Sequence, residues 1–304
     1  MKIINNKFNL KVTKNSALVI GNFDGLHKGH VSILNEAIKV AKKNKIKTGL
    51  LTFDPNPKEF FSKSQNFKII NTHEKKRILN KMNIDYLIIL KFNKSLRNLT
   101  AENFIKKILK KKINPSKIIV GKEFKFGKNR IGNPSLLKKY FSTNIASQKK
   151  IAGKKISSSE IRRLISIGNI SQVCKLLGRN WSVNGKVVGG DRIGRKLGYR
   201  TANIFLNDCI LPLRGVYVTR LYINRMIFDG ISNFGVAPTF GNKDKDVLET
   251  HLFTPVRNLY KKTITIEFIK FLRKEKKFNS KKNLLDQIKK DITAAKKVLK
   301  NVRD

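Results

Sequence analysis

Strand-like and helix-like segments alternate over the first 180 residues of this chain, and the alternation then stops. Short apolar runs occur at 17–20, 49–53, 86–90 and 117–120. Helical patterns lie between these runs, at 30–43, 74–82 and 101–112. Because parallel strands need long crossover connections, which are usually helices, this order predicts a parallel sheet covered by helices. Turns at the ends of such strands would place ligands at one edge of the sheet.

The pattern changes near Gly178, and the rest of the chain reads mainly as short strands. Runs rich in β-branched and aromatic residues, separated by turn residues, lie at 181–188, 215–223, 226–236, 247–253 and 263–271. Strands at this spacing are typical of a closed or sandwiched sheet. Apolar residues at helical spacing over 280–302 predict a final helix with one apolar face. We therefore expect an α/β domain over 1–180 and a β domain over 181–304, and 304 residues suffice for two cores.

The segment from Gly21 to His30 joins the first apolar run to the first helical pattern. It reads Gly-Asn-Phe-Asp-Gly-Leu-His-Lys-Gly-His. A helix start offers unpaired N–H groups and a partial positive charge, which suit phosphate. His27 and His30 are three residues apart, so their side chains can point the same way. We favour a phosphate-binding turn here over a surface loop with incidental histidines.

This decapeptide resembles the G-x-F-D-G-x-H-x-G-H signature of bacterial FAD synthetases, which belong to the HxGH nucleotidyltransferase superfamily. Residues 51–57, Leu-Thr-Phe-Asp-Pro-Asn-Pro, resemble T-F-D-P-H-P, with Asn56 where His is usual. Residues 120–127 resemble V-G-x-D-F-x-F-G, with Glu123 at the acidic or amide position. Residues 156–162 resemble I-S-S-T-x-I-R, with Ser159 in place of Thr.

A fifth motif lies in the β region. Residues 194–203, Gly-Arg-Lys-Leu-Gly-Tyr-Arg-Thr-Ala-Asn, resemble the riboflavin kinase signature G-R-x-L-G-[FY]-P-T-A-N, with Arg200 in place of Pro. Together the motifs resemble those of bifunctional riboflavin kinase/FAD synthetases. The resemblance implies a Rossmann-like HxGH nucleotidyltransferase domain, followed by a riboflavin-kinase-like β-barrel with a C-terminal helix. It also implies that riboflavin and ATP give FMN, and that FMN and ATP give FAD and pyrophosphate, both with Mg²⁺.

The first reaction site would use imidazole donors and phosphate-binding groups. Adenylyl transfer builds negative charge on the α-phosphate oxygens, where fixed donors such as His27 and His30 can stabilise it. The resemblance assigns ATP contacts to Gly21, Phe23, Asp24, Gly29, Glu123, Ser158, Ser159 and Arg162. Some of these residues also have plainer interpretations. Asp24 can simply order the turn, and the serines with Arg162 can be a helix cap and a solvated side chain.

The second site would use oxygen ligands and a carboxylate. Thr201 and Asn203 are two apart, so on an extended segment both face one side. The resemblance makes them the Mg²⁺ ligands and ATP contacts, and it makes Glu249 the catalytic base. The alternative for Glu249 is a cross-strand ion pair on a lysine-rich surface. Gly190 and its neighbouring glycines would cradle phosphate, although ordinary β-turns use the same residues.

The charge balance does not by itself identify a partner. The formal net charge is +46, from 66 Lys and Arg against 20 Asp and Glu. Such a balance would attract nucleic acid through counterion release. However, the lysines are spread along the whole chain beside many Asn and Ile, which share AT-rich codons, so genome base bias accounts for them. Anionic ATP, FMN and pyrophosphate would also be drawn to this surface.

Two alternatives to a bifunctional enzyme remain at this level. Arg200 or Glu123 could have disabled one site, or the scaffold could serve nucleic-acid binding, with Phe124 and Phe126 interleaved among lysines.

We expect a cytoplasmic protein. The chain has only two cysteines, it shows no apolar h-region of a signal peptide, and no apolar run reaches the roughly 20 residues needed to span a membrane. The oligomeric state cannot be predicted from these patterns.

Overall fold

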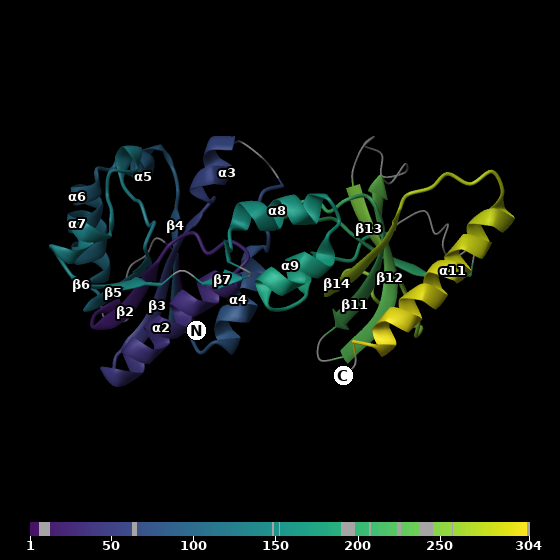
Figure 1. The fold of residues 1–304 in the computed structure, drawn as a ribbon, viewed down its shortest axis with the longest axis horizontal. Coiled ribbons are helices and arrows are strands. Elements are labelled where there is room, and N and C mark those ends of the chain that lie inside the picture. The colour runs from purple at the N-terminus through teal and green to yellow at the C-terminus, as the bar shows by residue number, and fades with distance from the viewer. Residues whose placement is uncertain are drawn as a thin grey trace. The chain divides into compact units, whose positions relative to one another are not determined.

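The computed structural model describes residues 1–5, 13–62, 66–147, 149–151, 153–189, 198–206, 208–223, 226–236, 246–256 and 258–302 (Figure 1). They form two compact units. The first comprises Met1–Gln65 and Lys75–Ser157, and the second comprises Asn66–Glu74 and Ser158–Asp304. Gly190, the first four residues of the 194–203 motif (194–197) and the turn residues at 224–225 and 241–242 lie outside the described residues. The domain boundary expected near residue 180 stays a prediction.

The first unit is built on a six-stranded parallel sheet with the order β1-β4-β3-β2-β5-β6. Its strands are β1 (Lys2–Asn5), β2 (Ser16–Ile20), β3 (Lys47–Asp54), β4 (Tyr86–Lys91), β5 (Lys117–Gly121) and β6 (Ser142–Ala146). The parallel sheet and its four apolar strands, β2 to β5, confirm the prediction. The two edge strands were missed, because β6 is largely polar and β1 is only four residues long.

The helices of this unit follow the strands. Those in the described ranges are α2 (Lys28–Lys43), α3 (Pro57–Ser62), α4 (Thr72–Lys81, which begins in the second unit), α5 (Lys94–Asn98), α6 (Ala101–Asn103) and α7 (Pro134–Lys138). Helix α6 continues into η1 (Phe104–Ile113), which is wound as a π-helix. Thr100 caps this helix, because its Oγ1 accepts a hydrogen bond from the Asn103 N–H at 3.2 Å.

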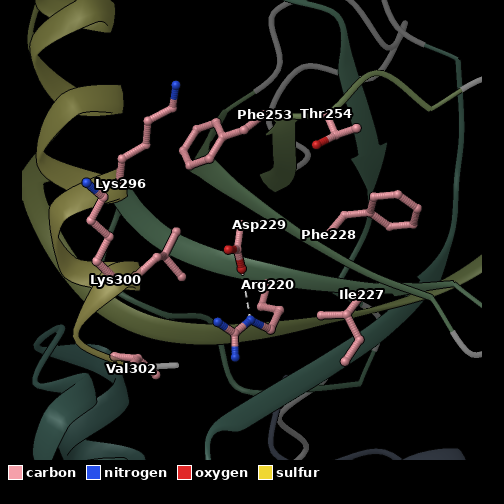
Figure 2. A pocket seen from close by; sticks show the side chains of 10 residues that line it. Arg220, Ile227, Phe228, Asp229, Phe253, Thr254, Lys296, Lys300 and Val302 are labelled. Carbon is pink, nitrogen blue, oxygen red and sulfur yellow. Dashed lines mark hydrogen bonds and ion pairs between the residues drawn. The ribbon is translucent and has the colours of Figure 1, made fainter. Parts of the chain in front are cut away.

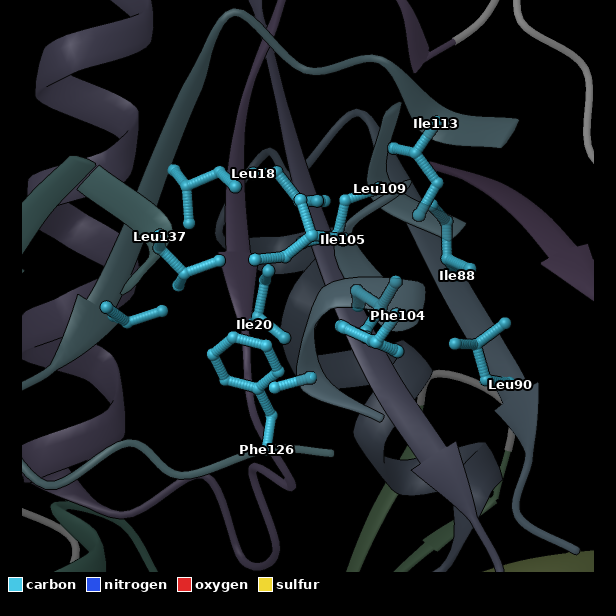
Figure 3. Packing of buried hydrophobic residues seen from close by; sticks show 14 of the residues in the cluster. Leu18, Ile20, Ile88, Leu90, Phe104, Ile105, Leu109, Ile113, Phe126 and Leu137 are labelled. Atoms are coloured by element: carbon cyan, nitrogen blue, oxygen red, sulfur yellow. The ribbon is translucent and has the colours of Figure 1, made fainter. Parts of the chain in front are cut away.

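The core on one face of the sheet joins strands to the long helix. Leu18 and Ile20 of β2 and Ile88 of β4 pack with Phe104 and Leu109 (Figure 3). All five side chains are at least 97 % buried. Burying each such side chain contributes about 1.5–3 kcal/mol, so this cluster holds the central strands firmly in place.

Strand β2 marks the place where the strand order reverses. The chain runs from β2 to β3 on one side, and it later places β5 on the other side of β2. In open α/β sheets the crevice outside the carboxyl ends of the strands at such a point is the usual ligand site. The turn that begins at Gly21 leaves β2 at this position.

The second unit is built on a six-stranded antiparallel sheet with the order β10-β13-β12-β11-β14-β9. The strands are β9 (Trp181–Lys186), β10 (Thr201–Ile204), β11 (Gly215–Ile223), β12 (Met226–Val236), β13 (Asp246–Leu252) and β14 (Thr263–Lys274). The sheet curls until its two ends meet, and the Val188 N–H donates to the Asn203 carbonyl at 2.9 Å. The predicted strands after Gly178 are confirmed.

Among its described residues the second unit also contains the helices α8 (Ser158–Ser166), α9 (Ile170–Leu177) and α11 (Lys281–Lys300). The predicted final helix is α11, which lies along β11 and β12 (Figure 1). Its Ala295 and Leu299 pack on Val218 and Ile269. No helix in the described part of the chain is both long and apolar enough to cross a membrane.

The segment Asn66–Glu74 docks on the second unit although it lies early in the chain. The Trp181 Nε1–H donates to the Ile69 carbonyl at 2.7 Å, and the Ser182 hydroxyl donates to Glu74 at 2.8 Å. Both hydrogen bonds are buried. The sequence pattern does not predict that residues 66–74 belong to the second unit, because this segment has no distinctive composition.

Candidate active sites

The turn from Gly21 to His30 takes an unusual backbone path. Phe23 and Leu26 adopt left-handed φ angles of 46° and 44°, and both side chains are buried. A Cβ atom added to Gly21 would lie 2.9 Å from the Phe23 ring. A Cβ atom added to Gly29 would lie 3.1 Å from the His27 ring. The two glycines therefore make room for the aromatic rings of the turn. This explains two of the predicted ATP-site glycines in terms of packing.

His27 and His30 come together at the start of α2. His27 is the N-cap residue, and its Nδ1 accepts a hydrogen bond from the His30 backbone N–H at 3.3 Å. The two rings stack with their centroids 3.7 Å apart and an interplanar angle of 17°. The expectation that both side chains point the same way is thus confirmed.

The electrostatic environment of His30 disfavours its protonated form. Burial lowers the pKa of His30 well below its ordinary value, and the charges of His27 and Lys75 lower it further. Its Nδ1 is buried and has no hydrogen-bond partner among the described residues. Near neutral pH the ring is therefore uncharged, with an unused polar atom beside a helix N-terminus.

Two further residues fix the turn, and neither is among the predicted site residues. The Asn22 carbonyl accepts hydrogen bonds from the Thr52 hydroxyl at 2.8 Å and from the Lys75 ammonium at 3.2 Å. Thr52 is buried at the end of β3, and Lys75 is half-buried in α4. A single lysine among 66 basic residues gives no recognisable pattern in the sequence.

Asn56, which departs from the usual His, has a structural role. Its Oδ1 accepts a hydrogen bond from the Lys58 N–H at 3.0 Å, and its own N–H donates to Glu59 at 3.0 Å. This reciprocal pair caps α3 in the manner of a capping box. The departure from the family motif thus leaves the local fold intact.

Glu123 lies two residues beyond the end of β5, at the same edge of the sheet as the Gly21–His30 turn. Its side chain is 62 % exposed and pairs with Lys155. The neighbouring Phe126 is buried, and Phe124 stacks on it with ring centroids 5.4 Å apart. Phe126 thus packs in the core of the first unit, and Phe124 is half-buried against it.

Ser158, Ser159 and Arg162 belong to the second unit. The two serines open α8, as expected. The Arg162 Nε–H donates to the Phe67 carbonyl at 2.9 Å, and its guanidinium lies 3.9 Å from the centre of the Phe67 ring. Arg162 is thus held by the segment Asn66–Glu74, which the sequence did not indicate.

The predicted kinase residues form a row across three strands. Asn203 of β10 lies directly opposite Glu249 of β13, which lies opposite Asn233 of β12. Residues that are directly opposite share a face, so these side chains and Thr201 are on one face of the sheet. Asn203 is buried, and its Oδ1 has no hydrogen-bond partner in the part of the chain that the structure describes. Thr201 is exposed and Glu249 is half-buried.

Arg200 directly precedes Thr201, and its backbone carbonyl is hydrogen-bonded to β13. Its carbonyl accepts a hydrogen bond from His251 Nδ1 at 3.0 Å, so Nδ1 carries the proton. The Tyr199 ring meets the His251 ring edge-on at 5.2 Å. His251 therefore fixes the chain just before Thr201, where the family motif has a proline.

A cavity of about 590 Å³ lies elsewhere in the second unit, between α11 and strands β11 and β12. Figure 2 shows the Arg220–Asp229 ion pair in this cavity, with Lys296 and Lys300 extending from α11. None of the predicted site residues lines it. The cavity is thus separate from the row that contains Asn203 and Glu249.

The two units together define a class of protein. One has a donor-rich turn at the switch point of a parallel sheet, and the other has an amide–carboxylate row on a curled antiparallel sheet. Both arrangements suit phosphate chemistry, so the fold and the sites define a two-domain enzyme of phosphate-group transfer.

Comparison with known proteins identifies the family. Residues 9–160 match the model of FAD synthetase, and residues 177–299 match that of riboflavin kinase. A bifunctional riboflavin kinase/FMN adenylyltransferase from Buchnera aphidicola subsp. Schizaphis graminum is 42 % identical, covering 98 % of both chains. The protein of that name from Escherichia coli K12 is 32 % identical, covering 97 % of both. The chain therefore belongs to the family of bifunctional riboflavin kinase/FMN adenylyltransferases.

A solved structure agrees with this architecture over the whole chain. It is the crystal structure of a protein from Streptococcus pneumoniae named as a macrolide-efflux protein. Its TM-score is 0.86 at 30 % identity, and the match covers 97 % of this chain and 99 % of that one. The fold is thus shared along nearly the full length.

Proposed function

We propose that this chain makes FAD from riboflavin in two reactions, each at its own site. The second unit would transfer phosphate from ATP to riboflavin, and the first would join AMP from ATP to the resulting FMN and release pyrophosphate. The observation that carries the proposal is that the predicted residues cluster: His27 with His30, and Asn203 with Glu249. Conversion of riboflavin and ATP to FMN and FAD by the pure protein tests it.

We propose that the first unit is an HxGH nucleotidyltransferase domain, which suits adenylyl transfer. A phosphate oxygen of FMN would attack the α-phosphorus of ATP while pyrophosphate leaves in line. His27 and His30, at the N-terminus of α2, would donate hydrogen bonds to the α-phosphate oxygens as their charge grows. The proposed contacts from Gly21, Phe23, Asp24 and Gly29 come from the same turn. Glu123 of the first unit and Ser158, Ser159 and Arg162 of the second unit remain proposed ATP contacts, as the family resemblance implies.

Riboflavin phosphorylation fits the row in the second unit. Glu249 would accept the proton of the riboflavin hydroxyl as its oxygen attacks the γ-phosphorus and ADP leaves. The outward face of β13 presents Glu249 next to Asn203, whereas Leu248 points into the core. This alternation places Glu249 on the same face of the sheet as Asn203.

Mg²⁺ fits the oxygen donors beside Glu249. Asn203 has a buried side-chain oxygen that lacks a partner within the described ranges, and Thr201 presents a hydroxyl on the same face. Oxygen ligands are those that Mg²⁺ prefers. Asn203 and Thr201 would hold the ion, which when bound would neutralise charge on the ATP phosphates.

Replacing Asn203 by alanine tests this metal site. The Mg²⁺ concentration for half-maximal FMN formation should rise by at least about 10-fold, because an oxygen ligand is lost. FAD formation from supplied FMN should keep its Mg²⁺ dependence. An unchanged Mg²⁺ dependence of FMN formation in the Asn203→Ala protein would remove Asn203 from the metal site.

The Arg200→Pro variant tests whether the departure from the family motif matters. Proline fixes φ and restricts the preceding residue, which stiffens the approach to Thr201 and Asn203. The hydrogen bond from His251 to the Arg200 carbonyl already supplies part of that restraint. We expect a fall of about 2–5-fold in the KM for ATP during FMN formation, with little change in kcat.

The result that would contradict this expectation is an inactive natural kinase. If the natural protein formed no FMN and Arg200→Pro restored the reaction, the chain would be a monofunctional enzyme.

Nucleic-acid binding stays the weaker alternative, and salt-dependent retention on single-stranded RNA would support it. A cytoplasmic location also stays a prediction. It agrees with the two cysteines, neither of which forms a disulfide.

A further inference from the structure

Lys75 lies beside the Gly21–His30 turn without being part of any family motif quoted above. Its ammonium donates a hydrogen bond to the Asn22 carbonyl at 3.2 Å. The Thr52 hydroxyl donates to the same oxygen at 2.8 Å. The next residue, Phe23, has a left-handed φ of 46° and packs its ring 4.7 Å from that of His30. The Asn22 peptide is therefore the point at which the turn is fastened to α4 and β3.

The charge of Lys75 also reaches the adenylyl-transfer histidines. Two groups contribute a charge that lowers the pKa of His30, in addition to burial: His27 from the same turn and Lys75 from α4. Lys75 is half-buried, so its field is screened less than that of the many exposed lysines. A cation at this place would attract nucleotide phosphates to the start of α2.

We infer that Lys75 is a positioning residue of the adenylyl-transfer site, which holds the turn through the Asn22 carbonyl and adds positive charge where the ATP phosphates bind. This inference rests on the proposed function of the first unit. A hydrogen bond to a charged donor is stronger than a neutral one. Thr52 donates only a neutral hydrogen bond to the same carbonyl. Replacing Thr52 therefore shows what loss of a hydrogen bond costs without any change of charge.

The test compares Lys75→Met, Lys75→Arg and Thr52→Val with the natural protein, at full length. Lys75→Met should lower kcat/KM for FAD formation by about 10–100-fold, mainly by raising the KM for ATP. Lys75→Arg keeps the charge and should retain most of the activity. Thr52→Val removes the second hydrogen bond to Asn22 without changing any charge, and its loss should be smaller.

The pH profile distinguishes a charge effect from a purely structural one. Removing the Lys75 charge should raise the pKa of His30 toward its ordinary value. Protonation of His30 would then begin at higher pH, so the acid limb of kcat/KM for FAD formation should move upward in Lys75→Met. Thr52→Val and Lys75→Arg should keep the natural limb. FMN formation by each variant serves as the internal control for folding.

Two results would overturn the inference. One is a Lys75→Met protein whose kcat/KM and pH profile for FAD formation are those of the natural protein. The other is a Lys75→Met protein whose defect and pH profile match those of Thr52→Val. If Lys75→Met does not fold, Lys75→Gln makes the same comparison, because its amide can still donate but carries no charge. A natural protein that forms no FAD would instead refute the proposed function.

Discussion

FMN formation is expected to fall by about 10²–10⁴-fold when Glu249 is replaced by glutamine, because glutamine keeps the shape but cannot accept the hydroxyl proton. The variant should still convert supplied FMN to FAD. Glu249 lies opposite Asn203 on a neighbouring strand, so the loss should appear mainly in kcat and not in the KM for ATP. Steady-state rates of FMN formation from riboflavin and ATP give both constants.

Glu267→Gln provides a matched control within the same unit. Glu267 accepts hydrogen bonds from Asn180 and Tyr222, and it lies on β14, away from the row that contains Glu249. We expect it to retain FMN formation. Normal FMN formation by Glu249→Gln would mean that Glu249 is not the base and only forms a surface ion pair.

FAD formation is expected to fall by about 10²–10³-fold in the His30→Ala protein, since one preorganised donor to the α-phosphate is lost. The buried Nδ1 of His30, which has no partner among the described residues, and the N-terminus of α2 are the structural reasons. FMN formation from riboflavin should not change, and it shows that the variant is folded. A His30→Ala protein that makes FAD at the natural rate would show that adenylyl transfer occurs elsewhere.

The sequence predicted those parts of the fold in which local pattern and burial agree. The fully buried β2 is an apolar run, and α2 has an apolar face. The polar β6 was missed because its edge position, and not its composition, makes it a strand. The docking of Asn66–Glu74 on Trp181 and Ser182 was missed because it depends on contacts between distant parts of the chain.

The candidate sites show the same division. His27 and His30 were predicted together because they are close in the chain, and Thr201 and Asn203 because they are two apart. That Asn203 lies opposite Glu249 depends on strand register, which the sequence pattern did not provide. Lys75 was missed because nothing local distinguishes it from other lysines. Its significance comes from the Asn22 carbonyl, 53 positions away in the sequence.

One time course tests the central claim most directly. The pure natural protein is incubated with riboflavin, ATP and Mg²⁺, and the flavins are separated by chromatography at successive times. We predict that FMN appears first and that FAD follows with the release of pyrophosphate. FMN that accumulates without any FAD, or riboflavin that stays unchanged while supplied FMN becomes FAD, would contradict the claim that this chain has both activities.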